Sequence, residues 1–248
     1  AQFSLGFCYD NGYGVAKDEV EAVKWYRKAA EQNHAPAQHI LGVSYAAGQS
    51  VTKDEVEAVK WYRKAAEQNL AWAQYDLGKC YAYGRGAAKD EVEAVKWYRK
   101  AAEQNNAQAQ FTLGGCYNFG QGVAKDYVEA VKWFRKAAKQ KNAPALYFLG
   151  VSYAAGQGVT KDEVAAVNWY RKAAEQNLAD AQYYLGNCYF KGQGVAKNYV
   201  ECYKWWLLAA GQGREDAKKT VTALESLMTR EQIAEGQKLA RNFKPQET

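Results

Sequence analysis

The sequence predicts an all-α protein, an α/α solenoid of six 36-residue helix-turn-helix repeats with C-terminal capping helices. The 17-residue stretch KDEVEAVKWYRKAAEQN occurs unchanged at 17–33, 53–69 and 89–105, and close variants start at 125, 161 and 197. The tryptophan at its centre recurs every 36 residues, and only three prolines interrupt the 248 residues. Self-similarity at such a period is typical of stacked repeats, so the length of the chain counts repeats.

The period defines the domain organisation. The repeats are expected at 1–36, 37–72, 73–108, 109–144, 145–180 and 181–216, which together make up residues 1–216. Residues 217–248 break the period and are expected to form a helical cap and tail. One helix is predicted from Ala217 to Met228, and Thr229 with Gln232 has the spacing of a capping box at the start of another. A more polar end unit covers the apolar surface that a solenoid otherwise exposes.

The first helix of each repeat is expected to begin at the alanine that opens the unit, such as Ala1 or Ala37. Gly6 and its equivalents cost roughly 1 kcal/mol of helix propensity, so we expect a neighbouring helix to approach closely there. A glycine pair, Gly12 and Gly14 in the first repeat, then ends the helix. The pair lacks a preceding strand, a third glycine and a GK[ST] motif, which favours a turn over a phosphate-binding loop.

The second helix of each repeat has clear start and stop signals. Asp18 and its counterparts are good N-cap residues, and Glu21 stands three residues on, as in a capping box. Trp25 and Tyr26 continue an apolar stripe, in which a buried tryptophan contributes roughly 4–6 kcal/mol gross. Asn33 is expected to close the helix.

The cysteines indicate free thiols. Four of the five share one repeat position, which Ser44 and Ser152 fill in the other two repeats, as expected of a small buried packing site. The odd count and the absence of a CxxC motif favour a reducing compartment, although Cys188 and Cys202 lie in the two helices of one repeat. The cytoplasm is therefore favoured. A periplasmic or secreted location stays open, because Ala1 already lies inside a repeat and the N-terminus looks truncated.

One unit, AQFTLGGCYNFGQGVAKDYVEAVKWFRKAAKQ at 109–140, closely resembles the Sel1-like repeat, a relative of the tetratricopeptide repeat. The resemblance covers residues 1–216, and MTREQIAEGQKLA resembles the closing helix of that family. It implies helix pairs stacked in a right-handed superhelix with a concave inner surface, and adaptors, many of them bacterial, that gather other proteins. In a cysteine-rich branch two cysteines per repeat form a bridge. Alanines such as Ala30 and Ala37 stand there in this chain, so that branch's properties do not transfer.

Positions four, seven and eleven of the first helix vary most between repeats and share one face, which we call the first-helix face. The resemblance implies that first helices line the concave surface, so we expect a protein or peptide partner to bind there, with aromatic anchors. The predicted contact residues are Phe7, Asn11, Ile40, Asp76, Lys79, Tyr83, Thr112, Phe119, Phe148, Tyr184, Asn187 and Lys191. The alternative is that the aromatic residues fill gaps between repeats. For Trp72, expected in an inter-repeat loop, partner contact and packing both stay open.

No catalytic residues, cofactor or metal site is predicted, because no acid pair, triad or ligand cluster stands out. The two histidines, His34 and His39, are interpreted as surface residues. No run of about 20 apolar residues suggests a membrane span, and a monomer is expected. The protein is therefore predicted to be a scaffold without enzymatic activity.

Two alternative functions stay open. The net charge is +6, and Lys24, Arg27 and Lys28 recur as a basic ladder, which would suit nucleic acid or an anionic surface. Glu21 and Glu31 stand at helix-pair spacing from these cations, which favours a self-compensated surface. The near-identical units also fit a designed or recently duplicated array without a specific ligand.

Overall fold

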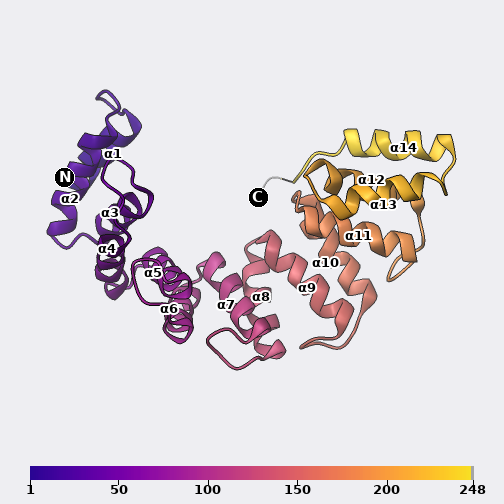
Figure 1. Ribbon diagram of the computed structural model, residues 1–248, viewed down its shortest axis with the longest axis horizontal. Helices are drawn as coiled ribbons and strands as arrows, with labels where there is room; N and C mark the ends of the chain where they lie inside the picture. Colours follow the sequence, from indigo (N-terminus) through magenta and orange to yellow (C-terminus); the bar gives the residue numbers. More distant parts are fainter. Residues whose placement is uncertain (247–248) are drawn as a thin grey trace. The chain divides into compact units, whose positions relative to one another are not determined.

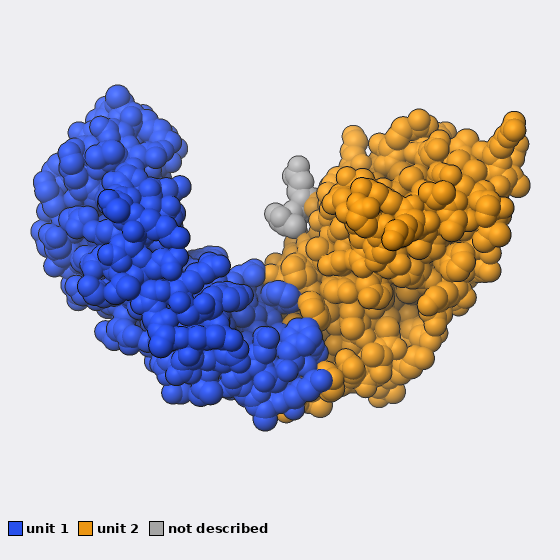
Figure 2. All heavy atoms as spheres, in the orientation of Figure 1, with its two compact units in different colours: residues 1–125 blue, residues 126–248 orange. Residues whose placement is uncertain are grey.

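A computed structural model describes residues 1–246, which form fourteen helices and no strands (Figure 1). The chain divides into two compact units, Ala1–Lys125 (unit 1) and Asp126–Thr248 (unit 2), coloured separately in Figure 2. The helices of unit 1 are α1 (Gln2–Asn11), α2 (Glu19–Glu31), α3 (Ala35–Ala47), α4 (Glu55–Glu67), α5 (Ala71–Tyr83), α6 (Glu91–Glu103) and α7 (Ala107–Phe119). Those of unit 2 are α8 (Tyr127–Lys139), α9 (Ala143–Ala155), α10 (Glu163–Glu175), α11 (Ala179–Lys191), α12 (Tyr199–Gly211), α13 (Glu215–Glu225) and α14 (Arg230–Arg241). The chain is thus an all-α solenoid of paired helices.

The first helices after α1 begin two residues earlier than predicted. The left-handed residue Asn33 (φ 64°) turns the chain, and His34 already acts as the N-cap of α3. The inter-repeat connection is therefore only three residues long, Gln32 to His34. The loop position predicted for Trp72 is wrong for the same reason, because Trp72 lies in the first turn of α5 and is 59% exposed.

The N-caps of the second helices are confirmed, but the capping boxes are not. Asp18 accepts a hydrogen bond from the Glu21 amide (2.9 Å), as predicted. The backbone amide of Asp18 donates to the carbonyl of Tyr9 in the preceding helix (2.9 Å), so it is not left for the Glu21 side chain. Glu21 accepts from Lys24 (2.9 Å) instead. The chain turn between the helices satisfies the amide that a capping box would otherwise serve.

The glycines act as predicted. Gly12 ends α1 in the left-handed conformation (φ 74°). In α5, a Cβ at Gly78 would lie 2.7 Å from the Tyr98 ring, so the absence of a side chain lets α5 and α6 approach. At the second glycine of the turn, a Cβ on Gly86 would collide with the Glu55 carbonyl of the preceding repeat. These glycines therefore set both the packing within a repeat and the spacing of repeats.

The core consists of the repeated alanines, leucines and aromatic residues. Trp61 and Trp97 are buried as predicted, whereas Trp169 remains partly exposed. The shared cysteine or serine position is buried at Cys80 and Ser44, which supports its interpretation as a packing site. All five cysteines are free.

Neighbouring repeats are also joined by a buried ladder of amide side chains. Gln38 is buried and donates to the carbonyl of Ala30 (3.0 Å) and to Oδ1 of Asn33 (3.2 Å). Gln68 of the following second helix donates to Gln38 Oε1 (2.6 Å) and to the same Asn33 oxygen (3.0 Å). The ladder therefore links the end of one repeat to both helices of the next.

The C-terminal helices pack on the last repeat. Both α13 and α14 contact α12, and a Cβ on Gly236 would lie 2.7 Å from the Tyr203 ring. The capping box of Thr229 and Gln232 is confirmed, with both of its hydrogen bonds present. The first of these helices covers Glu215–Glu225 rather than Ala217 to Met228. The predicted cap and tail ends at 248, and its residues 247–248 lie outside the described residues.

Candidate partner-binding face

Position eleven of the repeat lies at the C-terminal end of each first helix, and its residue is exposed in all six. In unit 1 this position holds Tyr83, 66% exposed, and Phe119, 59% exposed. Phe7, one turn back on α1, is 48% exposed, and its ring lies 5.9 Å from that of Tyr13. The first-helix face of unit 1 thus presents large aromatic side chains to solvent.

Tyr83 also has a charged neighbour. The guanidinium carbon of Arg85 lies 5.3 Å from the centre of the Tyr83 ring, within cation–π range. The other predicted residues of this face in unit 1 vary in exposure: Asn11 is exposed and donates to the Phe7 carbonyl (2.9 Å), while Ile40 and Thr112 are half-buried.

Asp76 is the polar centre of the face in unit 1. Its carboxylate lies 2.8 Å from His39 Nε2 on α3 and 2.7 Å from Lys79 Nζ on α5, and its side chain is only 17% exposed. Burial raises the pKa of Asp76, but the hydrogen bonds from His39 and Lys79 outweigh it and hold the pKa below its usual value. His39 is therefore part of an inter-repeat contact rather than a solvated surface residue.

A cavity of about 380 Å³ adjoins this cluster. Besides Asp76 and Lys79, its lining includes Lys53, Tyr62 and Arg85. Tyr62 is buried, and its ring packs against His39 with centroids 5.8 Å apart. The cavity combines charged groups of both signs with an aromatic wall, the mixture that fixes the orientation of a polar ligand.

In unit 2 the corresponding aromatic residues are more engaged in packing. Phe148 is half-buried and stacks on the fully buried ring of Phe134, with centroids 5.2 Å apart. Tyr184 is 37% exposed and meets Tyr147 edge to face at 5.5 Å. The other two predicted residues are Asn187, half-buried, and Lys191, exposed.

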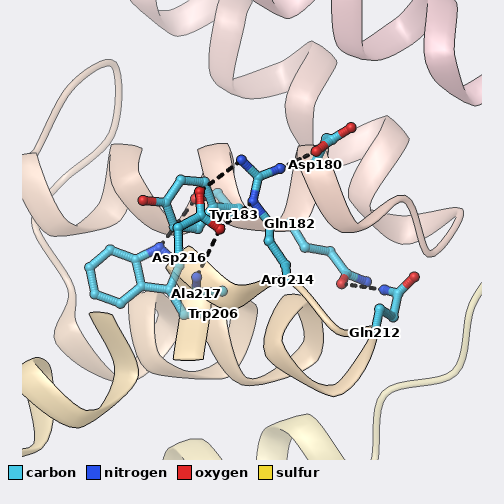
Figure 3. Close-up of polar contacts among 8 residues, drawn as sticks. All are labelled: Asp180, Gln182, Tyr183, Trp206, Gln212, Arg214, Asp216 and Ala217. Carbon is cyan, nitrogen blue, oxygen red and sulfur yellow. Dashed lines mark hydrogen bonds and ion pairs between the residues drawn. The ribbon is translucent and has the colours of Figure 1, made fainter. Parts of the chain in front are cut away.

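Beside this part of unit 2, Arg214 makes a group of polar contacts that the sequence did not predict (Figure 3). Its guanidinium makes two hydrogen bonds to Asp216 (2.7 and 3.0 Å), pairs with Asp180, and lies 4.4 Å from the centre of the Tyr183 ring. The Trp206 indole donates to the Tyr183 carbonyl (3.2 Å) behind it. The only signal for these contacts in the sequence was that Asp216 lies two residues after Arg214 and that Asp180 holds the same position one repeat earlier.

The arginines of the basic ladder are used between repeats. Arg27 donates to the hydroxyl of Tyr45 in the next repeat (2.8 Å), and its guanidinium carbon lies 5.6 Å from that ring. The predicted pairing of Arg27 with Glu31 is wrong, because the guanidinium of Arg27 donates to the Tyr45 hydroxyl instead. The same contact joins Arg135 to Tyr153 (2.8 Å).

The lysines of the ladder also have contacts within the chain. Lys24 pairs with Glu21 as predicted (2.9 Å). Lys28 lies over the Trp25 ring, with its Nζ 4.0 Å from the centroid. Each class of cation in the ladder is therefore already in contact with an acid or an aromatic group of the protein.

Within residues 1–246, no group of three or more histidine, cysteine, aspartate or glutamate side chains is arranged to hold a metal ion. In the same range, no helix has both the length and the apolar character needed to cross a membrane. His34 serves as an N-cap, accepting a hydrogen bond from the Ala37 amide (3.2 Å).

Comparison with solved structures identifies close relatives. A protective antigen of uropathogenic Escherichia coli that displays an SLR fold is 36% identical, with a TM-score of 0.88. The match covers 97% of this chain but 52% of that one, so this chain spans about half the length of the E. coli protein. A Sel1 repeat protein from Oxalobacter formigenes is 40% identical, with a TM-score of 0.77 over 85% of this chain and 86% of that one.

More distant structures share the fold alone. An immunity protein from Pseudomonas aeruginosa is 24% identical, with a TM-score of 0.52 over 85% of this chain and 81% of that one. A search of curated proteins finds no match.

The family assignment follows from the repeats themselves. The Sel1 repeat model matches residues 1–34, 35–70, 73–106, 107–142, 143–178 and 179–213. Sel1 repeat proteins generally mediate protein–protein interactions. With six matches that span nearly all of the paired helices, the chain belongs to the Sel1 repeat family.

Proposed function

We propose that the chain binds a peptide or an extended protein segment along the first-helix face of unit 1, without chemistry of its own. The observation that carries the proposal is the exposure of Tyr83 and Phe119 at the same position of consecutive repeats. Exposed aromatic side chains at regular spacing suit a partner's apolar side chains, because aromatic groups dominate the energy of protein interfaces.

The polar cluster supports the same function. Asp76 and Tyr83 are seven residues apart on α5, so they lie on one face of the helix, two turns from each other. The Asp76–Lys79 pair and the adjoining cavity offer charged groups that can orient a peptide, while Tyr83 offers apolar contact area. A partner recognised in this way contacts several first helices at once.

The proposal is tested by selecting binders from a random dodecapeptide display library on the whole chain. Selected peptides are then measured by fluorescence anisotropy against the native chain and the Tyr83→Ala, Phe119→Ala double variant. We expect affinity to fall at least tenfold in the variant. The matched control is Val92→Ala, which truncates an exposed apolar residue of α6 and should leave affinity unchanged.

Two outcomes would count against the proposal. Selected peptides that bind the native chain and the double variant equally would place the interaction elsewhere. Tight binding of a labelled DNA duplex that weakens steeply with salt would favour the basic ladder as the functional surface.

A further inference from the structure

The junction between the fourth and fifth repeats departs from the other junctions at three positions. Lys139 stands where four other repeats have glutamate, and Lys141 stands where four others have asparagine. Leu146 stands at the position where the other repeats have glutamine, such as Gln38 in the second repeat. The three changes remove one negative charge, add two positive charges and delete two amide groups at a single junction.

These changes break the amide ladder at this junction. At an intact junction, Asn33 and Gln38 each accept a hydrogen bond from the side-chain amide of Gln68. The equivalent residues here, Lys141 and Leu146, have no side-chain oxygen, so neither can accept from the side-chain amide of Gln176. In the part of the chain that the structure describes, Gln176 Oε1 is buried and has no hydrogen-bond partner. An unsatisfied buried polar atom costs about 1–3 kcal/mol, and this junction has that cost in addition to lacking the two ladder bonds that the Gln176 side chain would donate.

The same residues line a cavity of about 560 Å³ in unit 2, a volume typical of ligand pockets. Its apolar part is formed by Leu146, which is buried, Ala138 and the partly exposed Trp169. Its charged part is formed by Lys139 and Lys141, together with the cations Arg135 and Lys172.

Lys139 and Lys141 are available to a ligand. Both are exposed, and no carboxylate among residues 1–246 forms an ion pair with either. The other two cations have partners, since Arg135 bonds Tyr153 and Lys172 lies over Trp169, with its Nζ 4.7 Å from the ring centroid.

The C-terminal segment forms one edge of the cavity. Gln246 lines the cavity, and its backbone amide donates to the Glu175 carbonyl (2.8 Å). The side chain of Gln246 donates to the carboxylate of Glu175 (3.1 Å), an acid that is not itself among the described lining residues. Among residues 1–246, the lining contains four basic side chains and no acidic one.

We propose that this cavity, which we call the junction pocket, binds an acidic peptide segment of a partner that carries an apolar side chain between two carboxylates. The carboxylates pair with Lys139 and Lys141, and the apolar side chain lies on Leu146 and Trp169. A backbone N–H of the peptide donates to Gln176 Oε1, the buried acceptor that has no partner among the described residues. A peptide supplies all three groups within a few ångströms of each other, whereas inorganic phosphate supplies only the charge.

The junction pocket is independent of the first-helix face. Its residues come mainly from the second helices α8 and α10 and from the turn that contains Lys141. Loss of binding at Tyr83 and Phe119 would therefore not alter binding in the junction pocket, and the two proposals can fail separately.

The test titrates the whole chain with the capped tripeptide Ac-Glu-Leu-Glu-NH2 and follows the Trp169 indole and the Gln176 side-chain amide by NMR. We expect saturable shifts of both signals. The capped tripeptide Ac-Gln-Leu-Gln-NH2 should bind at least tenfold more weakly, because it lacks the charges. Absence of saturation with the acidic peptide, or equal binding of the neutral peptide, would overturn the proposal.

The matched variant is the triple change Lys139→Glu, Lys141→Asn, Leu146→Gln, which installs residues found at the other junctions. It should abolish the shifts and restore protection of the Gln176 amide. The control is Lys219→Glu, an exposed lysine of α13 outside the pocket, which should bind as the native chain does.

A check of the fold and a titration with phosphate complete the test. Circular dichroism checks the fold of the triple variant, and the single change Lys141→Asn, expected to weaken binding about threefold or more, replaces it if it does not fold. Inorganic phosphate is titrated in parallel. If phosphate saturates the same signals as tightly as the acidic peptide, the pocket is a general anion site and the peptide assignment is wrong.

Discussion

The side-chain amides of Gln38 and Gln68, thirty residues apart, are joined by a hydrogen bond of 2.6 Å. The bond recurs between Gln74 and Gln104 at 2.7 Å and in the last repeat at 2.8 Å. In each case one partner is buried and bonds the end of the preceding second helix, so the ladder fixes how one repeat sits on the next. Stacking in this solenoid therefore depends on buried polar contacts as well as on apolar area.

Replacing Gln74 with leucine should destabilise unit 1. Gln74 is buried and bonds the Ala66 carbonyl, Asn69 and Gln104, so leucine leaves those groups without their partner. We expect the free energy of unfolding to fall by about 2–3 kcal/mol, measured by guanidinium denaturation followed by circular dichroism.

A double-mutant cycle tests whether the ladder causes this loss. Gln104→Ala removes the exposed partner, and the double variant with Gln74→Leu should be more stable than the sum of the two changes predicts. Strict additivity would show that the two amides are not coupled.

Gly78→Ala should destabilise the chain although alanine is the better helix former. The new Cβ would lie 2.7 Å from the ring of Tyr98, which is itself buried and cannot move away freely. Overpacking costs about 1–3 kcal/mol, which exceeds the gain of up to 1 kcal/mol in helix propensity.

The chain supplies its own control for this prediction. Gly115 lies inside α7, and a Cβ there meets nothing within 4 Å. Gly115→Ala should therefore raise the midpoint of thermal unfolding, while Gly78→Ala should lower it. If both changes stabilise the chain, helix packing at Gly78 is looser than the structure indicates.

The helical repeats were predictable because each signal is local and recurs. Asp18 as an N-cap and Gly12 as a helix stop depend only on their nearest neighbours, so sequence spacing was enough. The capping box of Glu21 failed because its backbone target is already bonded to Tyr9, a contact that depends on how two helices meet. The amide ladder was missed for the same reason, since its members are separated by about a repeat.

The candidate face was partly predictable. Comparison of the repeats correctly placed Tyr83 and Phe119 at an exposed position. It could not distinguish Phe148, because variation between repeats also occurs where a side chain fills local space, as this ring does on Phe134. Variation at Lys141 and Leu146 was visible in the sequence, but their shared cavity depends on the three-dimensional junction.

Asp76→Asn should destabilise the chain in a pH-dependent way. The folded-state pKa of Asp76 is lowered, so its ionised form contributes stability above the unfolded pKa of about 3.9 and loses it as pH falls through the folded value. We expect a cost of about 1–3 kcal/mol near neutral pH that shrinks below about pH 4.

The control for Asp76 is Asp126→Asn. Asp126 is an exposed N-cap, and Asn198 serves the same role in the last repeat, so this change should cost little at any pH. If the cost of Asp76→Asn stays constant from neutral to acidic pH, the substitution acts through altered packing and not through the lost charge.

Thiol labelling should separate the cysteines by burial. Burial raises the pKa of Cys80 and Cys116 to about 11, and it also raises that of the fully buried Cys202. At about pH 8 these thiols carry far less of the reactive thiolate than an ordinary cysteine, whose pKa is about 8.5. Iodoacetamide should therefore label the partly exposed Cys8 first, as measured by peptide mapping with mass spectrometry. All five should react together in concentrated guanidinium chloride, and rapid labelling of Cys202 in the native chain would show that α12 opens without global unfolding.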